Sequence, residues 1–278
     1  MQEISLASLS EDETLDLIFE RVCRVDPTPP GACFFRLESV PADFDSAAFQ
    51  QRQVNLVVSL SERVERRRGE PLAVVSAGRF DQQNTTRPHL DGGPAENLLI
   101  LGYEPTEVPS SFFTYDLARF AADRELSPAE AMDRHNPMFP ASDADWASYE
   151  CKIEGFEGRS WRIVILNNSS TSRDGISWQG VLHAATVPRP DPSATRAVNS
   201  MMAAPPIAGR RNPLRRQALR LRRRRSGSPC RRITRVGRPY ARVWRNGLSR
   251  GQLDYFHIPS VSPIPSRGEP VRTSSATT

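Results

Sequence analysis

Two of the four histidines lie at positions where they could serve as metal ligands. His89 and Asp91 form a His-x-Asp motif in a polar stretch that leads into an apolar run, and His183 lies within the apolar run GVLHAATV. Two imidazoles and one carboxylate on one face of a metal ion form a facial triad, which suits Fe(II) and leaves coordination positions open. The sequence therefore predicts that His89, Asp91 and His183 bind iron if the fold brings them together.

Arg196 follows His183 by 13 residues and could hold an anionic ligand of the same site. A guanidinium binds a carboxylate through two parallel hydrogen bonds, which a lysine does less well. Asn84 precedes the His-x-Asp motif and could donate a further hydrogen bond to that ligand. Ordinary structural roles stay open as well: turn residues for Asn84 and Asp91, loop or core histidines, and an exposed strand cation for Arg196.

Three blocks of the sequence resemble the Fe(II)/2-oxoglutarate-dependent oxygenases, and in particular an uncharacterised bacterial branch of that superfamily. The blocks are NTTRPHLDGGPAENLLILGYEPTEVPS, NNSS and GVLHAATVPRPDPSATRAVNS. The resemblance implies that His89, Asp91 and His183 are the iron ligands. It also implies that Arg196, assisted by Ser200, pairs with the distal carboxylate of the cosubstrate 2-oxoglutarate.

The resemblance spans about residues 79–200 and implies a double-stranded β-helix, a cupin-like jelly-roll barrel. The interval from Asp91 to His183 is longer than is common in the superfamily, and a helical insert at about residues 105–150 would account for it. The commoner pattern also places a serine two residues after the arginine, whereas Ser200 follows Arg196 by four.

The implied activity is the oxidation, by default the hydroxylation, of an unidentified small-molecule substrate, with Fe(II) and 2-oxoglutarate. Two other classes of function stay open. One is a catalytically inactive, cupin-like binding module, and the other is a nucleic-acid-binding protein that acts through the arginines of residues 210–250. The sequence does not indicate the oligomeric state.

The order of apolar runs and turns predicts an α+β domain built round an antiparallel sheet or barrel, with flanking helices. A first helix is expected from about residue 11, capped by Ser10, and another is expected after Ser127, which forms a capping-box pattern with Glu130. The remaining expected elements are a helix at 46–69, a mainly helical segment at 111–149, and strands at 32–40, 71–80, 97–103, 159–170, 180–188 and 196–202.

Charge divides the chain near residue 205. The first 205 residues contain 19 basic and 30 acidic side chains, whereas residues 206–278 contain 18 arginines and two acids. The net charge of +5 therefore arises from the tail alone. We expect an oxygenase-like barrel domain at 1–205 and an Arg-rich tail at 206–278 that is disordered or non-native, for example the product of an out-of-frame read.

Several other classes are disfavoured by the sequence. No apolar run approaches the ~18 residues needed to cross a bilayer. The first residues carry acids where a signal peptide needs positive charge, which predicts a cytoplasmic protein without a membrane partner. The four cysteines are widely spaced, so neither a zinc ribbon nor a disulfide framework is expected.

Overall fold

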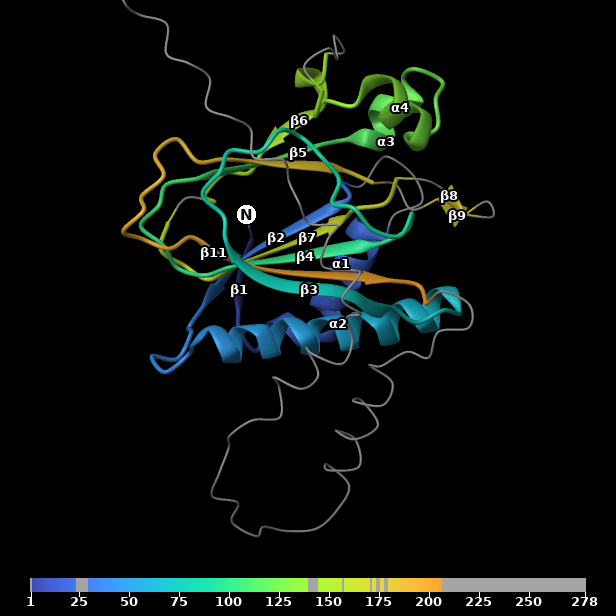
Figure 1. The fold of residues 1–278 in the computed structure, drawn as a ribbon. Helices are drawn as coiled ribbons and strands as arrows, with labels where there is room; N and C mark the ends of the chain where they lie inside the picture. The colour runs from blue at the N-terminus through green and yellow to red at the C-terminus, as the bar shows by residue number, and fades with distance from the viewer. Residues whose placement is uncertain are drawn as a thin grey trace, which may run out of the picture. The chain divides into compact units, whose positions relative to one another are not determined.

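The computed structural model describes residues 2–23, 30–139, 145–156, 158–170, 172–173, 176–177 and 180–206. Its larger sheet contains six strands (Figure 1). In spatial order they are β1 (Gln2–Ser5), β2 (Ala32–Glu38), β7 (Arg162–Asn167), β4 (Leu98–Tyr103), β11 (Ala197–Ala204) and β3 (Ala73–Asp81). Neighbouring strands are antiparallel except β1 and β2. A smaller antiparallel sheet contains β10 (Leu182–Thr186), β5 (Ser111–Tyr115) and β6 (Glu150–Lys152), and β8 (Ser172–Arg173) pairs with β9 (Ile176–Ser177).

Two helices, α1 (Asp12–Val22) and α2 (Ser46–Arg68), pack against the larger sheet (Figure 1). Helix α2 begins where the Asp45 carboxylate accepts a hydrogen bond from the Ala48 N–H at 2.8 Å, and it ends at Gly69 with φ of 79°. It can approach β4 closely because Gly102 has no side chain, since a Cβ there would lie 2.6 Å from the Phe49 ring. This contact fixes the helix against the centre of the sheet.

The shorter helical elements are η1 (Ser8–Ser10), α3 (Leu117–Ala122), α4 (Pro128–His135) and η2 (Ala147–Tyr149). The expected capping box of Ser127 and Glu130 is confirmed at the start of α4. The expected Ser10 cap is wrong, because Ser10 belongs to η1, and Glu11 precedes α1 without a side-chain capping bond.

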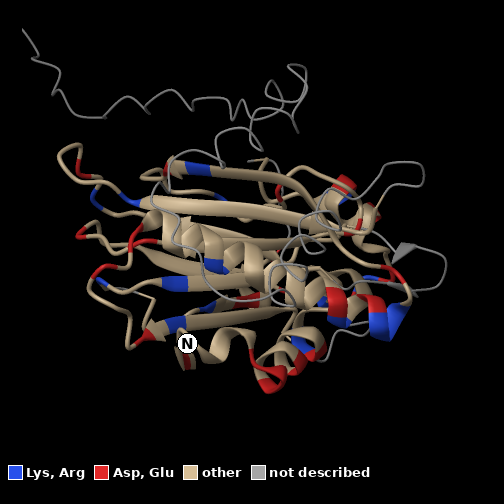
Figure 2. Ribbon diagram, turned by 90° about the horizontal axis from the view of Figure 1, so that it is seen from below, with Lys and Arg blue, Asp and Glu red and all other residues tan. Residues whose placement is uncertain are grey.

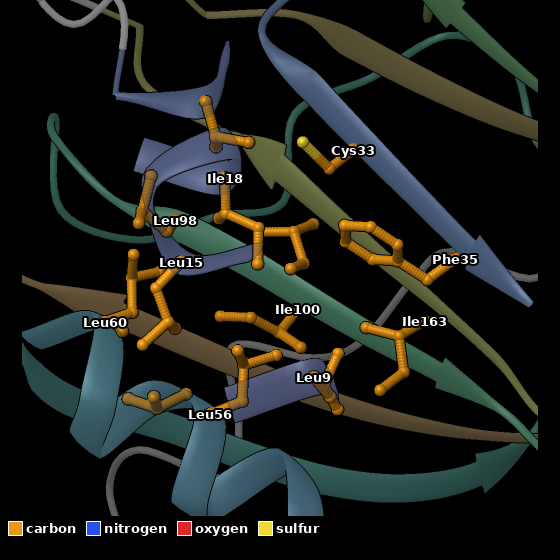
Figure 3. Close-up of a cluster of buried hydrophobic side chains, with 14 of the residues drawn as sticks. Leu9, Leu15, Ile18, Cys33, Phe35, Leu56, Leu60, Leu98, Ile100 and Ile163 are labelled. Atoms are coloured by element: carbon orange, nitrogen blue, oxygen red, sulfur yellow. The ribbon is translucent and has the colours of Figure 1, made fainter. Parts of the chain in front are cut away.

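Alternating side chains of the larger sheet fill two separate cores. In β4, Leu98 and Ile100 pack with α1 and α2, as Figure 3 shows, whereas Leu99, Leu101 and Tyr103 face the opposite core. Successive residues of a strand point to opposite faces, so an all-apolar strand must be covered on both sides. The second core also contains Phe112 of β5, so it lies between the two sheets.

The two sheets share a nested strand pairing. Strand β3 pairs with β11, and β4 pairs with β7, while β5 pairs with β6. Residues 86–89 lie beside β10 through His89, which forms an isolated bridge with His183. Along residues 73–204 the first strand thus pairs with the last, and each inner strand pairs in turn. The fold is a mixed α+β arrangement of mostly antiparallel sheets that are not closed into a barrel.

The structure corrects one boundary of the expected helical segment. Residues 111–115 were expected to be helical, but they form β5, because pairing with both β6 and β10 overrides the weak helical spacing of the apolar residues. Helices α3 and α4 follow β5, so the helical part of the expected insert begins at Leu117. The Arg-rich tail from residue 207 lies outside the described residues.

Candidate metal centre

His89 and His183 lie directly opposite each other on adjacent chain segments. The backbone N–H of each donates to the carbonyl of the other at 3.0 Å, and the Thr86 N–H donates to the Ala185 carbonyl at 2.8 Å. Opposed residues of an antiparallel pair carry their side chains on the same face. The two imidazoles therefore lie together, with ring centroids 4.3 Å apart.

Asp91 adds a carboxylate to the same face, since residues two apart in an extended segment point the same way. Its Oδ1 lies 3.4 Å from Nε2 of His89 and 3.9 Å from Nε2 of His183. One ligand atom from each of the three residues lies within 4.8 Å of the others. The His183 side chain is 8% exposed, but that of Asp91 is 29% exposed, so the group is enclosed without being sealed. The three side chains could hold one metal ion.

The His89 ring is oriented by a backbone contact. Its Nδ1 lies 2.7 Å from the Arg87 carbonyl oxygen. A proton on Nδ1 donates to that oxygen, so Nε2, which lies beside Asp91, is the nitrogen that can bind a metal ion once its own proton is lost. The His183 ring is stacked on Phe112 instead, at 6.1 Å between centroids and 10° between planes. Both imidazoles are thus held in place by the surrounding fold.

Asn168, the residue after β7, holds the backbone of Asp91. Its Oδ1 accepts from the Asp91 N–H and its Nδ2 donates to the Asp91 carbonyl, both at 2.9 Å. Nδ2 also donates to Oδ1 of Asn97 at 2.8 Å, which fixes the amide. Asn168 is buried, and its amide ties the loop after His89 to the larger sheet. The position of the Asp91 carboxylate therefore depends on this asparagine.

The three ligand candidates influence one another's protonation. Burial, followed by the charge of His89, lowers the pKa of His183 to about 4, against the opposing effect of Asp91. Burial also lowers the pKa of His89, but hydrogen bonds to Asp91 and to the Arg87 carbonyl outweigh it, so that pKa is raised. Burial raises the pKa of Asp91, yet the hydrogen bond from His89 and the charges of both histidines leave it lowered. At neutral pH, His183 is neutral and Asp91 is ionised, as metal ligands must be.

Arg196 is buried with part of its guanidinium unpaired. The group is 1% exposed, and its Nη1 donates to the Gln82 carbonyl at 2.6 Å. Its Nε and Nη2 make no hydrogen bond of ordinary geometry with the described residues, although an interaction of the guanidinium with the Tyr103 hydroxyl is among the effects that lower the pKa of Tyr103. These two nitrogens form one edge of the guanidinium, and parallel donors on one edge match the two oxygens of a carboxylate. A buried donor without a partner is costly, so this edge suits an anionic ligand.

A row of aromatic rings connects Arg196 to the metal centre. The guanidinium carbon of Arg196 lies 5.0 Å from the ring centroid of Tyr103. Tyr103 is 6.1 Å from Phe112, and Phe112 is 6.1 Å from His183. The charges of Arg196 and Asp91 both act on the pKa of Tyr103, which burial raises. Arg196 and the three ligand candidates therefore face the same interior between the sheets.

The other two sequence candidates differ in position. Ser200 is half-buried on β11 opposite Leu101, and strand alternation places it on the same face as Arg196. Asn84 is exposed, and its carbonyl accepts a bond from the Gln82 side chain at 3.4 Å. The fold thus brings Ser200 toward the interior but does not bring Asn84 to the cluster.

Sequence reasoning missed a second buried guanidinium, that of Arg162 at the start of β7. The available signal was an arginine that opens the apolar strand RIVILN, where a cation is unexpected.

Comparisons with known proteins do not assign the chain. No protein-family model matches it, and no curated protein matches it. None of the helices in the described ranges has the length and apolar character required to cross a membrane.

Proposed function

We propose that the protein is an Fe(II)- and 2-oxoglutarate-dependent oxygenase that oxidises, by default hydroxylates, an organic substrate. One observation carries the proposal. His89, Asp91 and His183 gather three ligand atoms within 4.8 Å, and the buried guanidinium of Arg196 lies against Tyr103 of the core between the sheets. A site for a metal ion beside a site for a carboxylate is what a metal-chelating oxo acid requires.

The strand pairing supports the fold that this function implies. A jelly roll is an antiparallel hairpin folded over itself, so that its strands pair first with last and inner with inner. The pairs β3 with β11, β4 with β7, and β5 with β6 follow this rule, as do residues 86–89 beside β10. We therefore propose a double-stranded β-helix with the metal centre between its two sheets.

The donor set fits Fe(II). Two imidazoles and a carboxylate on one side leave three positions open, and harder all-oxygen sites favour magnesium or calcium instead. When bound, Fe(II) with 2-oxoglutarate would supply the oxidising chemistry, with dioxygen as the oxidant: one oxygen atom would go to the succinate formed by decarboxylation and the other to the substrate C–H bond.

The residues of the chain position these groups. His89, Asp91 and His183 hold the metal, and Arg196 holds the distal carboxylate of the oxo acid, with Ser200 on the same strand face. The aromatic core beside them excludes water, which strengthens the contact between guanidinium and carboxylate.

Removal of one imidazole tests the metal centre. We expect His183→Ala to weaken Fe(II) binding at least about a hundredfold, because one of three protein ligands is lost. Anaerobic calorimetry of the full chain measures the affinity. The matched control is His135→Ala, which removes a histidine of α4 that is outside the cluster and is expected to bind Fe(II) normally. Unchanged Fe(II) affinity in folded His183→Ala would contradict the assignment.

Removal of the guanidinium tests the cosubstrate position. Arg196→Leu is expected to weaken 2-oxoglutarate binding at least about tenfold, because a charge-assisted bidentate contact is lost, while Fe(II) affinity changes little. Equal loss of both affinities would point to a structural role for Arg196. Absence of 2-oxoglutarate binding by the folded wild-type protein would favour the alternative of a cupin-like binding module.

A further inference from the structure

Arg162 is a second buried cation that faces the core between the sheets. It is 1% exposed, although most charged residues lie on helices and loops (Figure 2). Among the residues that the structure describes, no acidic side chain forms an ion pair with it. A buried charge without a counter-charge costs several kcal/mol, so such a group is usually paired in the functional state.

The guanidinium of Arg162 is held rigidly with one nitrogen free. Its Nε donates to the Ser160 carbonyl at 3.1 Å, and Nη1 donates to the Phe156 carbonyl. Its Nη2 is buried and has no hydrogen-bond partner within the described ranges. The guanidinium carbon lies 4.6 Å from the ring centroid of Phe156 and 5.7 Å from that of Tyr103. The free nitrogen is a buried donor without a partner, and a single donor of this kind can contact one oxygen of an anion.

Tyr103 lies between Arg162 and Arg196. Its strand, β4, runs between β7 and β11, and Tyr103 is paired with Arg162 on one side and with Val198 on the other. Both guanidinium carbons lie within 6 Å of its ring centroid. Burial, against the effect of Tyr103 and together with the charge of Arg196, lowers the pKa of Arg162 to about 10, so it stays charged at neutral pH. The two arginines thus form two cationic positions on either side of one ring.

The charges of the proposed catalytic complex leave Arg162 unbalanced. Fe(II) and Arg196 together carry three positive charges, and ionised Asp91 and the 2-oxoglutarate dianion carry three negative charges. The cosubstrate is already matched by the bidentate edge of Arg196, so Arg162 is available for a different anion. We propose that Arg162 binds a carboxylate of the primary substrate, and this inference rests on the proposed function.

The test uses trifluoroacetate as a monoanionic probe that carries its own NMR signal. The full chain is first saturated with Zn(II), a redox-inactive substitute for iron, and with 2-oxoglutarate. Fluorine NMR then measures trifluoroacetate binding to the wild-type protein, Arg162→Gln and Arg162→Lys. The matched control is Arg159→Gln, because Arg159 is exposed and forms an ion pair with Glu107 at 2.5 Å. Calorimetry on the same samples measures 2-oxoglutarate affinity, and near-ultraviolet circular dichroism confirms folding.

We expect Arg162→Gln to weaken trifluoroacetate binding at least about tenfold, because a charged hydrogen bond is lost. Arg159→Gln should bind the probe as the wild type does within about threefold. Arg162→Lys, which retains the charge but loses the fixed guanidinium fork, should bind the probe more tightly than Arg162→Gln does. The lysine variant also decides the test if the glutamine variant does not fold, since probe binding by Lys but not by an Arg162→Met variant would support the proposal.

Two results would overturn it. One is a folded Arg162→Gln variant that binds the probe normally, and the other is a selective loss of 2-oxoglutarate affinity in that variant, which would make Arg162 part of the cosubstrate site. If the wild-type protein binds the probe through Arg162 but never binds 2-oxoglutarate, the anion site is supported and the proposed function is contradicted.

Discussion

At the residue scale, the candidate metal centre depends on side chains other than its three possible ligands. The Asn168 amide contacts both the N–H and the carbonyl of Asp91, and a change in that amide would let the loop and its carboxylate move. Residues that hold a metal ligand in place commonly affect the metal affinity, although they do not contact the metal. The neighbouring Asn167 is also buried, but it donates to the Val22 carbonyl instead.

We therefore expect Asn168→Ala to weaken Fe(II) binding about 10- to 100-fold, as is typical when the support of a ligand is removed. Asn167→Ala serves as the matched control, with lower stability and nearly unchanged Fe(II) affinity. Affinity is measured by anaerobic calorimetry, and stability by urea unfolding. If Asn167→Ala lost as much Fe(II) affinity as Asn168→Ala for the same loss of stability, Asn168 would have no specific role in positioning Asp91.

Protonation of His89 makes metal binding pH-dependent. In the metal-free protein the pKa of His89 is raised above 6.5, because its hydrogen bonds to Asp91 and to the Arg87 carbonyl outweigh burial. A metal ion must displace this proton. Fe(II) affinity should therefore fall about tenfold per pH unit once the pH drops below that pKa, and it should level off above it. Calorimetric titrations between about pH 5 and 8.5 measure the profile. An affinity that does not vary with pH would exclude His89 as a ligand.

At the element scale, a buried carboxylate connects helix α2 to three strands. Glu104 accepts two hydrogen bonds from Arg79 at 2.8 and 2.9 Å, one from Ser46 at 2.7 Å and one from Asn199 at 2.9 Å. Burial raises its pKa, but these bonds outweigh burial and lower the pKa to about 2. This network joins β3, β4 and β11 on the face of the sheet that α2 covers. Tyr103 and Ser200 lie on the opposite face of the same strands, toward the core between the sheets.

Glu104→Gln should reduce the free energy of unfolding by about 1–3 kcal/mol at pH 7, since charged hydrogen bonds become neutral. A lowered folded-state pKa contributes stability above the unfolded value of 4.5, and this contribution is lost as the pH falls toward 2. The difference in the free energy of unfolding between the wild type and Glu104→Gln should therefore become smaller as the pH falls from 5 to 3, as measured by urea unfolding. The exposed Glu107→Gln variant is the control. A difference in the free energy of unfolding that does not change with pH would contradict the stabilising role of the ionised Glu104 carboxylate.

The sequence predicts elements more reliably than it predicts their contacts. Apolar runs and local caps identify β4, β7 and α2 because these signals lie within a few residues of one another. The sequence predicts a helix for residues 111–115, because their strand character arises from pairing with β6 and β10, which no local pattern reveals. The sequence likewise does not predict that His89 pairs directly with His183, since the two residues lie in segments far apart along the chain. Arg162 was overlooked because its burial depends on Tyr103 and Phe156.

At the scale of the whole molecule, the nested pairing explains why distant motifs converge. Folding the chain from β3 to β11 over itself brings residues 86–89 beside β10 and so unites the His-x-Asp motif with His183. The same folding places Arg196, just before β11, against Tyr103 of the adjacent strand. The expected metal ligands and carboxylate partner thus follow from one topology.

In the proposed site, His89, Asp91 and His183 hold Fe(II) while Arg196 holds 2-oxoglutarate on the same ion. Anaerobic titration of the full chain with Fe(II) and 2-oxoglutarate tests it most directly, because chelation of both produces a weak visible charge-transfer band. We expect a saturable band in the wild-type protein and no band in His89→Ala. A folded wild-type protein that binds Fe(II) but develops no band with 2-oxoglutarate would contradict this assignment of the site.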